Sequence, residues 1–444
     1  MKKQKEEHAE PDENGAGAFR MRKVCLRLSR KQKATLRKWM GGARFVYNAG
    51  VEHVRRGGAV GRTELRRSFA AEGSPLVLAN PWLKSVPYKV REQATDDLYK
   101  AHQANLAKRK NDPKHRKWTF KFRSRKNPSA WTIGVVSAMF NCAEVVDRPT
   151  TRRPRRDGQP HAETRVRKWT RLRLYREKDN VLGIFHAVEA LPATVLSGKE
   201  GVRAVTRDCK MTLDFRGRFY LCVPIPVDTP PVAKAEAERT VVALDPGVRA
   251  FQTYYSPETH GAYAEGERGF ARIYAHCQQL DETVSLKAQH PKSRASQRAC
   301  ANALVRLRAR IRNLVDETHK KVALDLVRRF DTVLIPDFKT KQMAQRKNRE
   351  DGKPRTLRSK TARSMLTWAH YRFRERLTHK ALAMGKEVVT VTEEYTSKTC
   401  GCCGHVNPKF SSKAFKCAAC GVEMDRDANG ARNIFLKHIK SPVA

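Results

Sequence analysis

Two pairs of cysteines with the same internal spacing constrain the carboxyl-terminal part of this chain more than any other feature. Each pair encloses two residues, and thirteen residues separate the pairs, which are Cys400 with Cys403 and Cys417 with Cys420. This spacing lets two turns bring four thiolates together in a tetrahedron, the arrangement of a zinc ribbon. A redox or disulfide role is the alternative. We therefore expect a structural zinc ion, with the intervening Cys402 as a bystander.

Acidic residues stand on both sides of the predicted ribbon. Glu393 and Glu394 precede it, and Asp425 and Asp427 follow it. Thiolates suit zinc, whereas carboxylates suit magnesium, so the ribbon could separate two halves of one hard-metal site. Charged residues beside a ribbon can equally form its solvated surface. A metal site here needs a third carboxylate from elsewhere in the chain.

The chain carries a large excess of positive charge. Its 444 residues include 90 Lys and Arg against 45 Asp and Glu, which gives a formal net charge of +45. This excess is far beyond what solubility requires and predicts a polyanionic partner. The sequence has no run of eighteen apolar residues and no signal peptide, so we expect neither a membrane span nor secretion and place the protein inside the cell.

Hydrophobic periodicity divides the first half of the chain into helical and strand-rich parts. Residues 1–17 are polar and without periodicity, which predicts a disordered tail. Alternation from Phe19 predicts a first strand, and helical spacing follows, with the Gly41–Gly42 pair as a break or a close-packing point. Short alternating segments over 169–227 predict a barrel or sheet. The Pro- and Ala-rich stretch from Asp228 predicts the main domain boundary.

Two basic segments are candidate nucleic-acid contacts. In the first, KWTFKFRSR, aromatic residues alternate with cations, which predicts a strand with an aromatic face and a cationic face. An ordinary sheet edge protected by charge is the alternative. The second, which begins at Arg148, is rich in Pro and Arg and is expected to be disordered until nucleic acid binds, or to act as a nuclear localisation signal. The candidates are Trp118, Lys121, Arg123, Arg125, Lys126, Arg152, Arg153, Arg155 and Arg156.

The second half of the chain has the element order of an α/β layer. A buried strand ends in Asp245, where an α/β nuclease can hold a metal ligand, although Asp-Pro-Gly can also be a simple turn. Strands and amphipathic helices then alternate around a central sheet. The predicted elements are strands over 241–244, 251–255, 332–338 and 388–394, and helices over about 293–330 and 364–384.

Four segments in this order resemble the RuvC-like nuclease of transposon-encoded TnpB proteins and of their eukaryotic and viral relatives, the Fanzor proteins. They are LDPGVRAF, IPDFKT, EEYTSKTCGCCG and CAACGVEMDRDANGARNI, and RFVYN matches in the first half. The resemblance implies an α+β multidomain protein with a wedge-like β-barrel, an inserted helical recognition module and an RNase H-like RuvC domain that contains the zinc ribbon. The implied ranges are 18–235 for the barrel with its module at about 30–115, 236–395 and 425–444 for the nuclease, and 396–424 for the ribbon.

The resemblance also assigns magnesium ligands. Asp245 matches the first RuvC aspartate and Asp427 matches the last, whereas Pro336 and Asp337 stand where TnpB proteins usually have a Glu. Fanzor proteins look similar in lacking that Glu and in placing another before the TSKTC segment, here Glu393, which favours Fanzor over ordinary TnpB. Glu394 is a close rival for this ligand position, because adjacent residues on a strand point to opposite faces and the sequence does not show which face meets the metal ions. The alternatives are Glu394, Asp337 and Asp425.

The function implied by the resemblance is RNA-guided DNA cleavage. A transposon-derived guide RNA would select the target DNA by base pairing, and two magnesium ions would support phosphodiester hydrolysis. The nucleus is the expected compartment in a eukaryotic host. One rival is a nucleic-acid-binding regulator or transposition accessory protein without cleavage, against which Asp245 and Asp427 argue. Another is a junction nuclease without a guide, which would not need so large a basic first half.

Overall fold

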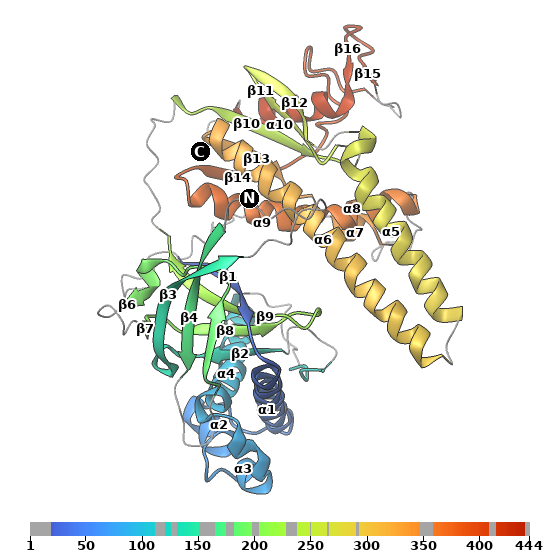
Figure 1. The fold of residues 1–444 in the computed structure, drawn as a ribbon. Coiled ribbons are helices and arrows are strands. Elements are labelled where there is room, and N and C mark those ends of the chain that lie inside the picture. Colours follow the sequence, from blue (N-terminus) through green and yellow to red (C-terminus); the bar gives the residue numbers. More distant parts are fainter. Residues whose placement is uncertain are drawn as a thin grey trace. The chain divides into compact units, whose positions relative to one another are not determined.

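The computed structural model of the chain contains two units, one up to Val227 and one from Asp228 (Figure 1). Each unit has its own hydrophobic core. No helix in the described ranges is long and apolar enough to cross a membrane. The described residues are 19–111, 120–125, 131–150, 165–174, 182–197, 204–227, 238–248, 250–263, 266–289, 293–338, 340–345, 358–407 and 414–439.

The first unit is built on a seven-stranded sheet with the order β2-β8-β9-β1-β5-β4-β3. The predicted first strand, β1, pairs antiparallel with both β9 and β5, and alternate side chains of β9 are buried, as a strand with one core face requires. In the described residues the end strands β2 and β3 do not pair, so a closed barrel is not shown. The strands are β1 (Phe19–Arg27), β2 (Thr132–Val135), β3 (Phe140–Thr150), β4 (Arg165–Leu174), β5 (Ile184–Ala187), β8 (Cys209–Leu213) and β9 (Phe219–Pro226), with β6 (Leu196–Ser197) and β7 (Ala204–Val205) in a separate pair.

Helices make up most of residues 30–111, between β1 and β2, as helical spacing predicts. Ser29 and Gln32 form a capping box that starts α1. The Gly41–Gly42 pair does not break this helix. Gly42 is instead a close-packing point, because a Cβ there would lie 2.6 Å from Cγ2 of Val86. The helices are α1 (Arg30–Arg55), α2 (Arg62–Phe69), α3 (Pro75–Ala79) and α4 (Tyr88–Asn111).

The strand predicted for KWTFKFRSR is wrong for the part that the structure describes. Residues 120–125 are irregular, and the backbone carbonyl of Phe120 accepts hydrogen bonds from the side chain of Arg55 rather than from a neighbouring strand. Phe120 is buried and its ring stacks on His102, with the ring centroids 6.1 Å apart. Core packing of one aromatic side chain therefore fixes residues 120–125, where Phe120 is buried and Phe122 is exposed.

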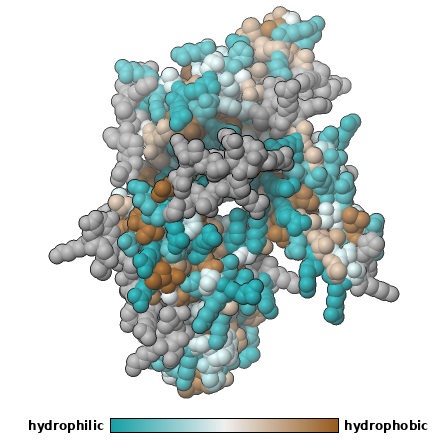
Figure 2. All heavy atoms as spheres, viewed as in Figure 1, coloured by the Kyte–Doolittle hydropathy of each residue, from teal (hydrophilic) through white to brown (hydrophobic). Residues whose placement is uncertain are grey.

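The visible surface of the first unit mixes cations with apolar side chains. Figure 2 shows apolar patches over β3 and β4 among hydrophilic side chains. Val145 of β3 and Val166 of β4 are exposed, as are Arg167, Lys168 and Arg173 on β4. This mixed surface is compatible with a large charged partner.

The second unit contains a five-stranded sheet with the order β12-β11-β10-β13-β14. The first three strands along the chain form an antiparallel meander, and β13 and β14 lie parallel to β10. The strand order along the sheet is therefore third, second, first, fourth and fifth. The strands are β10 (Val241–Pro246), β11 (Gln252–Ser256), β12 (Thr259–Tyr263), β13 (Thr332–Pro336) and β14 (Glu387–Val391), and the small pair is β15 (Ala414–Lys416) with β16 (Glu423–Asp425).

Helices cover both faces of this sheet (Figure 1). Apolar side chains of α6 and α9 pack with Val242 and Leu244 of β10, whereas Ile434 and Phe435 of α10 pack with Ala243 on the other face. Sequence periodicity missed β12 and α5. The helices are α5 (Gly266–Gln289), α6 (Arg294–Arg329), α7 (Thr340–Met343), α8 (Ser359–Trp368), α9 (His370–Leu382) and α10 (Arg426–Ile439).

The single helix predicted over about 364–384 is wrong, because the chain forms two helices there. Ala369 separates α8 from α9 and has a left-handed backbone, with φ of 51° and ψ of 55°. A left-handed residue cannot continue a right-handed helix. Trp368 and His370, on either side of this break, are both buried. Their packing holds the break in place.

A buried carboxylate links two helices of the first unit. Arg62 and Arg66 of α2 each donate two hydrogen bonds to Asp96 of α4, and Nη2 of each arginine lies 2.8 Å from Oδ2. Burial alone would raise the pKa of Asp96. The hydrogen bonds from the two arginines outweigh this effect and lower the pKa to about 2.

We expect Asp96→Asn to lower the free energy of unfolding of the first unit by about 1–3 kcal/mol near pH 7, because two arginines lose a buried charged acceptor. The folded-state pKa lies below the unfolded value, so the contribution of Asp96 is present above about pH 4 and is lost as the pH falls towards 2. Urea unfolding followed by hydrogen exchange of α2 and α4 at several pH values measures both effects. The difference between wild type and variant should shrink across that window.

Glu144→Gln is the matched control. Glu144 is exposed and lies 3.8 Å from Arg171, and such a surface pair contributes less than about 1 kcal/mol. Equal losses in the two variants would contradict a special role for Asp96.

Candidate active site and cysteine cluster

Strand alternation directs Asp245 towards α10. Val242 and Leu244 of β10 belong to the core under α6 and α9, and Ala243 belongs to the core under α10. Because side chains alternate along a strand, Asp245 lies on the α10 face with Ala243. It is the fifth residue of β10, opposite Thr253 of β11. The sequence therefore places this carboxylate at the end of a core strand, as predicted.

Helix α10 brings further carboxylates to this face. Asp425 caps the helix, since its Oδ1 accepts the backbone N–H groups of Asp427 at 2.8 Å and Ala428 at 3.0 Å. Asp427 lies in the first turn and forms an ion pair with Arg426. Gly430, one turn further on, touches Asp245 directly, because a Cβ at Gly430 would lie 2.6 Å from Oδ2. Only a glycine lets this helix approach Asp245 so closely.

Glu393 lies in a turn beyond β14 rather than on the strand, which corrects the sequence-based expectation. The strand ends at Val391. Both the N–H and the Oγ1 of Thr396 donate to the carbonyl of Glu393, at 3.3 and 2.8 Å, and fix this turn. Burial and the nearby charge of Asp337 raise the pKa of Glu393. Its carboxylate is half-buried, whereas Glu394 is exposed.

Acidic neighbours influence the electrostatics of Asp245. Burial raises the pKa of Asp245 to about 8, and the negative charges of Asp427, Glu393 and Asp425 add to this effect, while Arg426 opposes it. Like charges at close range disfavour ionisation unless a cation lies between them. Asp245, Glu393 and Asp427 are hard oxygen donors, so the set fits magnesium, with these three residues as the ones that would hold it.

The three alternative carboxylates have other surroundings. Asp337 follows the last residue of β13, and its Oδ1 is 2.6 Å from Nη1 of Arg374 on α9. Asp425 uses Oδ1 as the helix cap. Glu394 borders a separate hollow of about 410 Å³ beside the cysteines and Lys437.

The four predicted cysteines lie together. Their sulfur atoms are all within 4.8 Å of one another, and within the described ranges this is the one group of three or more His, Cys, Asp or Glu found close enough to hold a metal ion. The Sγ atoms of Cys400 and Cys420 are 3.7 Å apart, and those of Cys403 and Cys417 are 3.5 Å apart. Zinc–sulfur bonds of about 2.3 Å in a tetrahedron give sulfur–sulfur distances of about 3.8 Å. Disulfide bonds, at about 2.0 Å, do not fit.

A glycine follows each cysteine pair and completes a matching turn. Gly404 and Gly421 have positive φ angles of 78° and 71°. Their N–H groups donate to the carbonyls of Cys400 and Cys417, at 2.9 and 3.0 Å. The sequence signal for these turns is C-x-x-C-G, present twice, which sequence reasoning did not use. Cys402 is exposed and contributes its N–H to Sγ of Cys400, at 3.4 Å.

Two asparagines of α10 fasten the first cysteine turn to the helix that carries Asp427. Asn429 is fully buried, accepts a hydrogen bond from the N–H of Gly401 at 3.0 Å and donates to the carbonyl of Thr399 at 2.8 Å. Asn433 donates to the carbonyls of Thr396 and Thr399, at 2.7 and 2.6 Å. Neither asparagine was singled out from the sequence, because its role depends on contacts with a distant turn.

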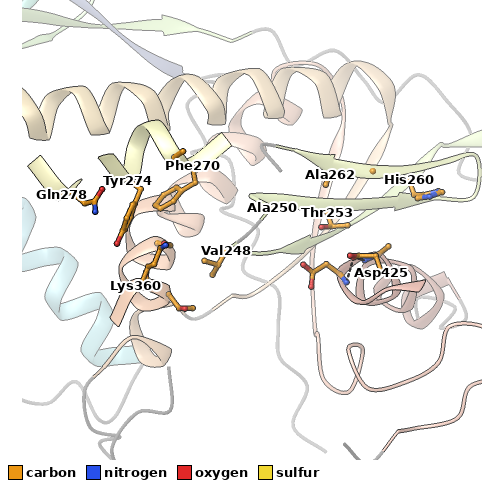
Figure 3. A pocket seen from close by; sticks show the side chains of 16 residues that line it. Val248, Ala250, Thr253, His260, Ala262, Phe270, Tyr274, Gln278, Lys360 and Asp425 are labelled. Atoms are coloured by element: carbon orange, nitrogen blue, oxygen red, sulfur yellow. Dashed lines mark hydrogen bonds between the residues drawn. The ribbon is translucent and has the colours of Figure 1, made fainter. Parts of the chain in front are cut away.

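A cleft of about 850 Å³ opens beside the carboxylates (Figure 3). Figure 3 shows Phe270, Tyr274 and Gln278 along α5 on one side, with Lys360 of α8 below them. Asp425 at the start of α10 stands at the other end, and Asp427 also lines the cleft. Asp425 and Asp427 are thus accessible from a cavity large enough for a ligand of drug size.

The predicted nucleic-acid contacts are only partly described. Lys121 and Arg125 are exposed. Arg123 forms an ion pair with Asp97 at 2.9 Å and lies 3.7 Å over the ring of Tyr47, so it has partners inside the protein. The candidates outside the described residues are Trp118, Lys126, Arg152, Arg153, Arg155 and Arg156.

Two family models match parts of the chain. A model for a Cas12f1-like TNB domain matches residues 370–434, which include the cysteine cluster and the start of α10. A model for a helix-turn-helix domain matches residues 20–56. In the structure that segment is one strand, β1, and one helix, α1, so it does not form a helix-turn-helix.

Whole-chain comparisons agree with these matches. The putative transposase A625R of Paramecium bursaria Chlorella virus 1 is 28% identical over 438 residues, covering 95% of this chain and 88% of that protein. The putative RNA-guided DNA endonuclease InsQ of Escherichia coli (strain K12) is 25% identical over 424 residues, covering 93% and 90%. The mini-RNA-guided endonuclease CRISPR-Cas_phi3 aligns with a TM-score of 0.52 over 97% of this chain and 94% of that chain, at 10% identity. The last comparison concerns the fold alone.

We expect the purified protein to contain about one zinc ion, and Cys403→Ser to release it and to unfold residues 396–424 locally. The reason is that a structural zinc ion contributes folding free energy directly. Elemental analysis measures the zinc content, and hydrogen exchange measures the local unfolding. Cys402→Ser is the matched control, because it removes an exposed neighbouring thiol outside the cluster. Well-folded wild-type protein without zinc would contradict the assignment.

Proposed function

Because the chain belongs to the TnpB/Cas12f-like family, we propose that it is an RNA-guided DNA endonuclease that hydrolyses DNA with magnesium ions. The observation that supports the proposal most is the packing of Gly430 against Asp245, which places the start of α10, with Asp427 in its first turn, beside the end of β10. A packed scaffold that collects carboxylates in this way suits metal-dependent phosphodiester hydrolysis.

The residues of the chain have separable roles in this mechanism. Asp245 of β10 and Asp427 of α10 would hold magnesium, and Gly430 lets the two elements approach each other closely. Glu393 completes the set from the turn that Thr396 fixes. Bound magnesium supplies a water of lowered pKa as the nucleophile and stabilises the leaving oxygen. The raised pKa of Asp245 favours a bound cation, since a cation relieves the repulsion among the carboxylates.

The position of the third ligand favours a Fanzor-like arrangement. Strand β13 ends in Pro336, which has no carboxylate, and Asp337 is paired with Arg374 of α9. Glu393 lies two residues beyond the end of β14, which pairs in parallel with β13. Its charge contributes to the raised pKa of Asp245. Glu394 is exposed and borders a different hollow. We therefore assign the third metal ligand to Glu393.

Guide RNA and target DNA account for the charge of the chain. A protein that holds a folded RNA, a heteroduplex and a displaced strand needs many cations, and the net charge is +45. Base pairing would supply the sequence choice, so the protein needs contacts to the backbone more than to bases. We propose a transposon-derived guide RNA as the partner. The cysteine cluster would hold zinc as a ribbon that braces α10.

The alternative function is a nucleic-acid-binding regulator or transposition accessory protein that keeps this fold without cleaving. The close packing of the start of α10 against Asp245 supports the nuclease over this alternative, because a protein that only binds nucleic acid does not need buried acidic side chains side by side. The cleavage assays below distinguish the two functions.

We expect a noncoding RNA to copurify with the protein, and replacement of its variable end to redirect cutting to a matching DNA. The reason is that the heteroduplex, not the protein, reads the sequence. RNA sequencing of the purified complex identifies the RNA, and cleavage of two DNA targets with two matched guides measures the redirection. Cutting that ignores the guide sequence would support a junction nuclease instead.

We expect Glu393→Gln to reduce magnesium-dependent cleavage by at least about 100-fold while RNA and DNA binding change little. The substitution is nearly isosteric and removes a charge that the metal ions need. Single-turnover cleavage and filter binding measure the two properties. Glu394→Gln is the matched control next to it and should keep most of the activity. Asp337→Asn should also matter little, because Asp337 is paired with Arg374.

Loss of cleavage in Asp337→Asn together with normal cleavage in both glutamate variants would show that the third ligand is on β13. Normal cleavage in all three variants would contradict the carboxylate site itself.

A further inference from the structure

We propose that the cleft beside the carboxylates is a subsite for one unpaired nucleotide of the DNA strand that is cut. In this subsite the ring of Tyr274 stacks on the base and the ammonium group of Lys360 binds a phosphate (Figure 3). The proposal rests on the proposed function and extends it, because it names residues outside the metal-binding set. It also assigns a role to α5 and α8.

Continuity with the carboxylates determines which part of a ligand the cleft can receive. Asp427 lines the same cavity as Tyr274 and Lys360. When the scissile phosphate of a DNA strand lies beside Asp427, a neighbouring nucleotide of the same DNA strand lies inside the cleft. The volume of about 850 Å³ lies within the range of about 300–1,000 Å³ that ligand pockets occupy. A base with its sugar and phosphate is a ligand of this class.

The wall formed by α5 is aromatic and firmly supported. The rings of Phe270 and Tyr274 are 6.0 Å apart, and Phe270 packs on the fully buried Trp368, with the ring centroids 5.2 Å apart. Tyr274 itself is half-buried, and its hydroxyl has no hydrogen-bond partner in the described part of the chain. An aromatic ring that packs on a buried neighbour and lines a cavity can act as a stacking platform for unpaired bases.

Lys360 supplies the charge that this platform needs. Its ammonium nitrogen lies 4.8 Å from the centroid of the Tyr274 ring, and the residue is exposed. Among the described residues it forms no ion pair with a carboxylate. This arrangement suits one nucleotide beside the proposed metal site, because the cation of Lys360 can bind its phosphate while the ring of Tyr274 stacks on its base. A peptide ligand would not explain why the cavity leads to Asp427.

Cleavage of DNA with single abasic positions tests the stacking contact in the purified protein–RNA complex. In wild type, an abasic residue at one position near the scissile phosphate should slow cleavage about tenfold, and Tyr274→Ala should slow cleavage of intact DNA by a similar factor. The same abasic residue should add less than about twofold to the loss in Tyr274→Ala, because both changes remove one contact. Tyr274→Phe keeps the ring and should recover most of the loss.

Salt dependence tests the phosphate contact. Lys360→Ala should raise KM several-fold and lower the slope of log KM against log salt by about 0.7, the value for one phosphate of a single strand. Lys360→Arg should restore the slope. Lys320→Ala removes one exposed charge from α6 outside the cleft and is the matched control.

Each result either supports or overturns the subsite. Wild-type cleavage by Tyr274→Ala, or abasic effects of equal size in wild type and variant, would overturn it. A wild-type complex that never cuts DNA would overturn the proposed function, and the subsite is then tested by photocrosslinking in Asp427→Asn. Iododeoxyuridine in a bound DNA strand should crosslink to the peptide that contains Tyr274, and crosslinks confined to other peptides would overturn the subsite.

Discussion

Repulsion among the carboxylates of Asp245, Glu393 and Asp427 is the interaction that the second unit must overcome. Burial and the negative charges of Asp427 and Glu393 raise the pKa of Asp245 to about 8, because both disfavour the ionised form of its carboxyl group. The sheet fixes β10 relative to β14 through β13, and the contact between Gly430 and Asp245 fixes α10 against β10. Apolar packing on both faces of the sheet thus maintains a site whose charges oppose it.

The cysteine cluster closes the segment that separates two of these carboxylates. Glu393 precedes the cysteines and Asp427 follows them. If the intervening segment were a flexible loop, bringing Glu393 and Asp427 together would cost loop-closure entropy. The buried Asn429 and Asn433 of α10 bind the first cysteine turn to this helix. Their side chains form hydrogen bonds with the backbone of Thr396, Thr399 and Gly401. The metal site that the cysteines offer and the carboxylate site are therefore mechanically connected, although they suit different metals.

Local patterns predicted the parts of this site that local structure determines. Strand alternation placed Asp245 at the end of a core strand, and spacing grouped the four cysteines. Alternation could not choose between Glu393 and Glu394, because the strand ends at Val391 and a turn orients both residues. Alternation also predicted a strand around Phe120 that core packing abolishes. The cleft was not predicted, because Tyr274 and Lys360 belong to helices that meet only in the folded unit.

The parallel pairing of β13 and β14 explains how a metal ligand can move between strands without leaving the site. Pro336 pairs with Val391, so the carboxyl ends of both strands reach the same edge of the sheet, about 4.8 Å apart. Leu334, Val389 and Val391 share the core under α10, and Asp337, beyond the end of β13, forms an ion pair with Arg374. Strand β13 thus ends in Pro336, which offers no carboxylate. Glu393 lies two residues beyond the partner of Pro336, and its turn brings the side chain back towards Asp245.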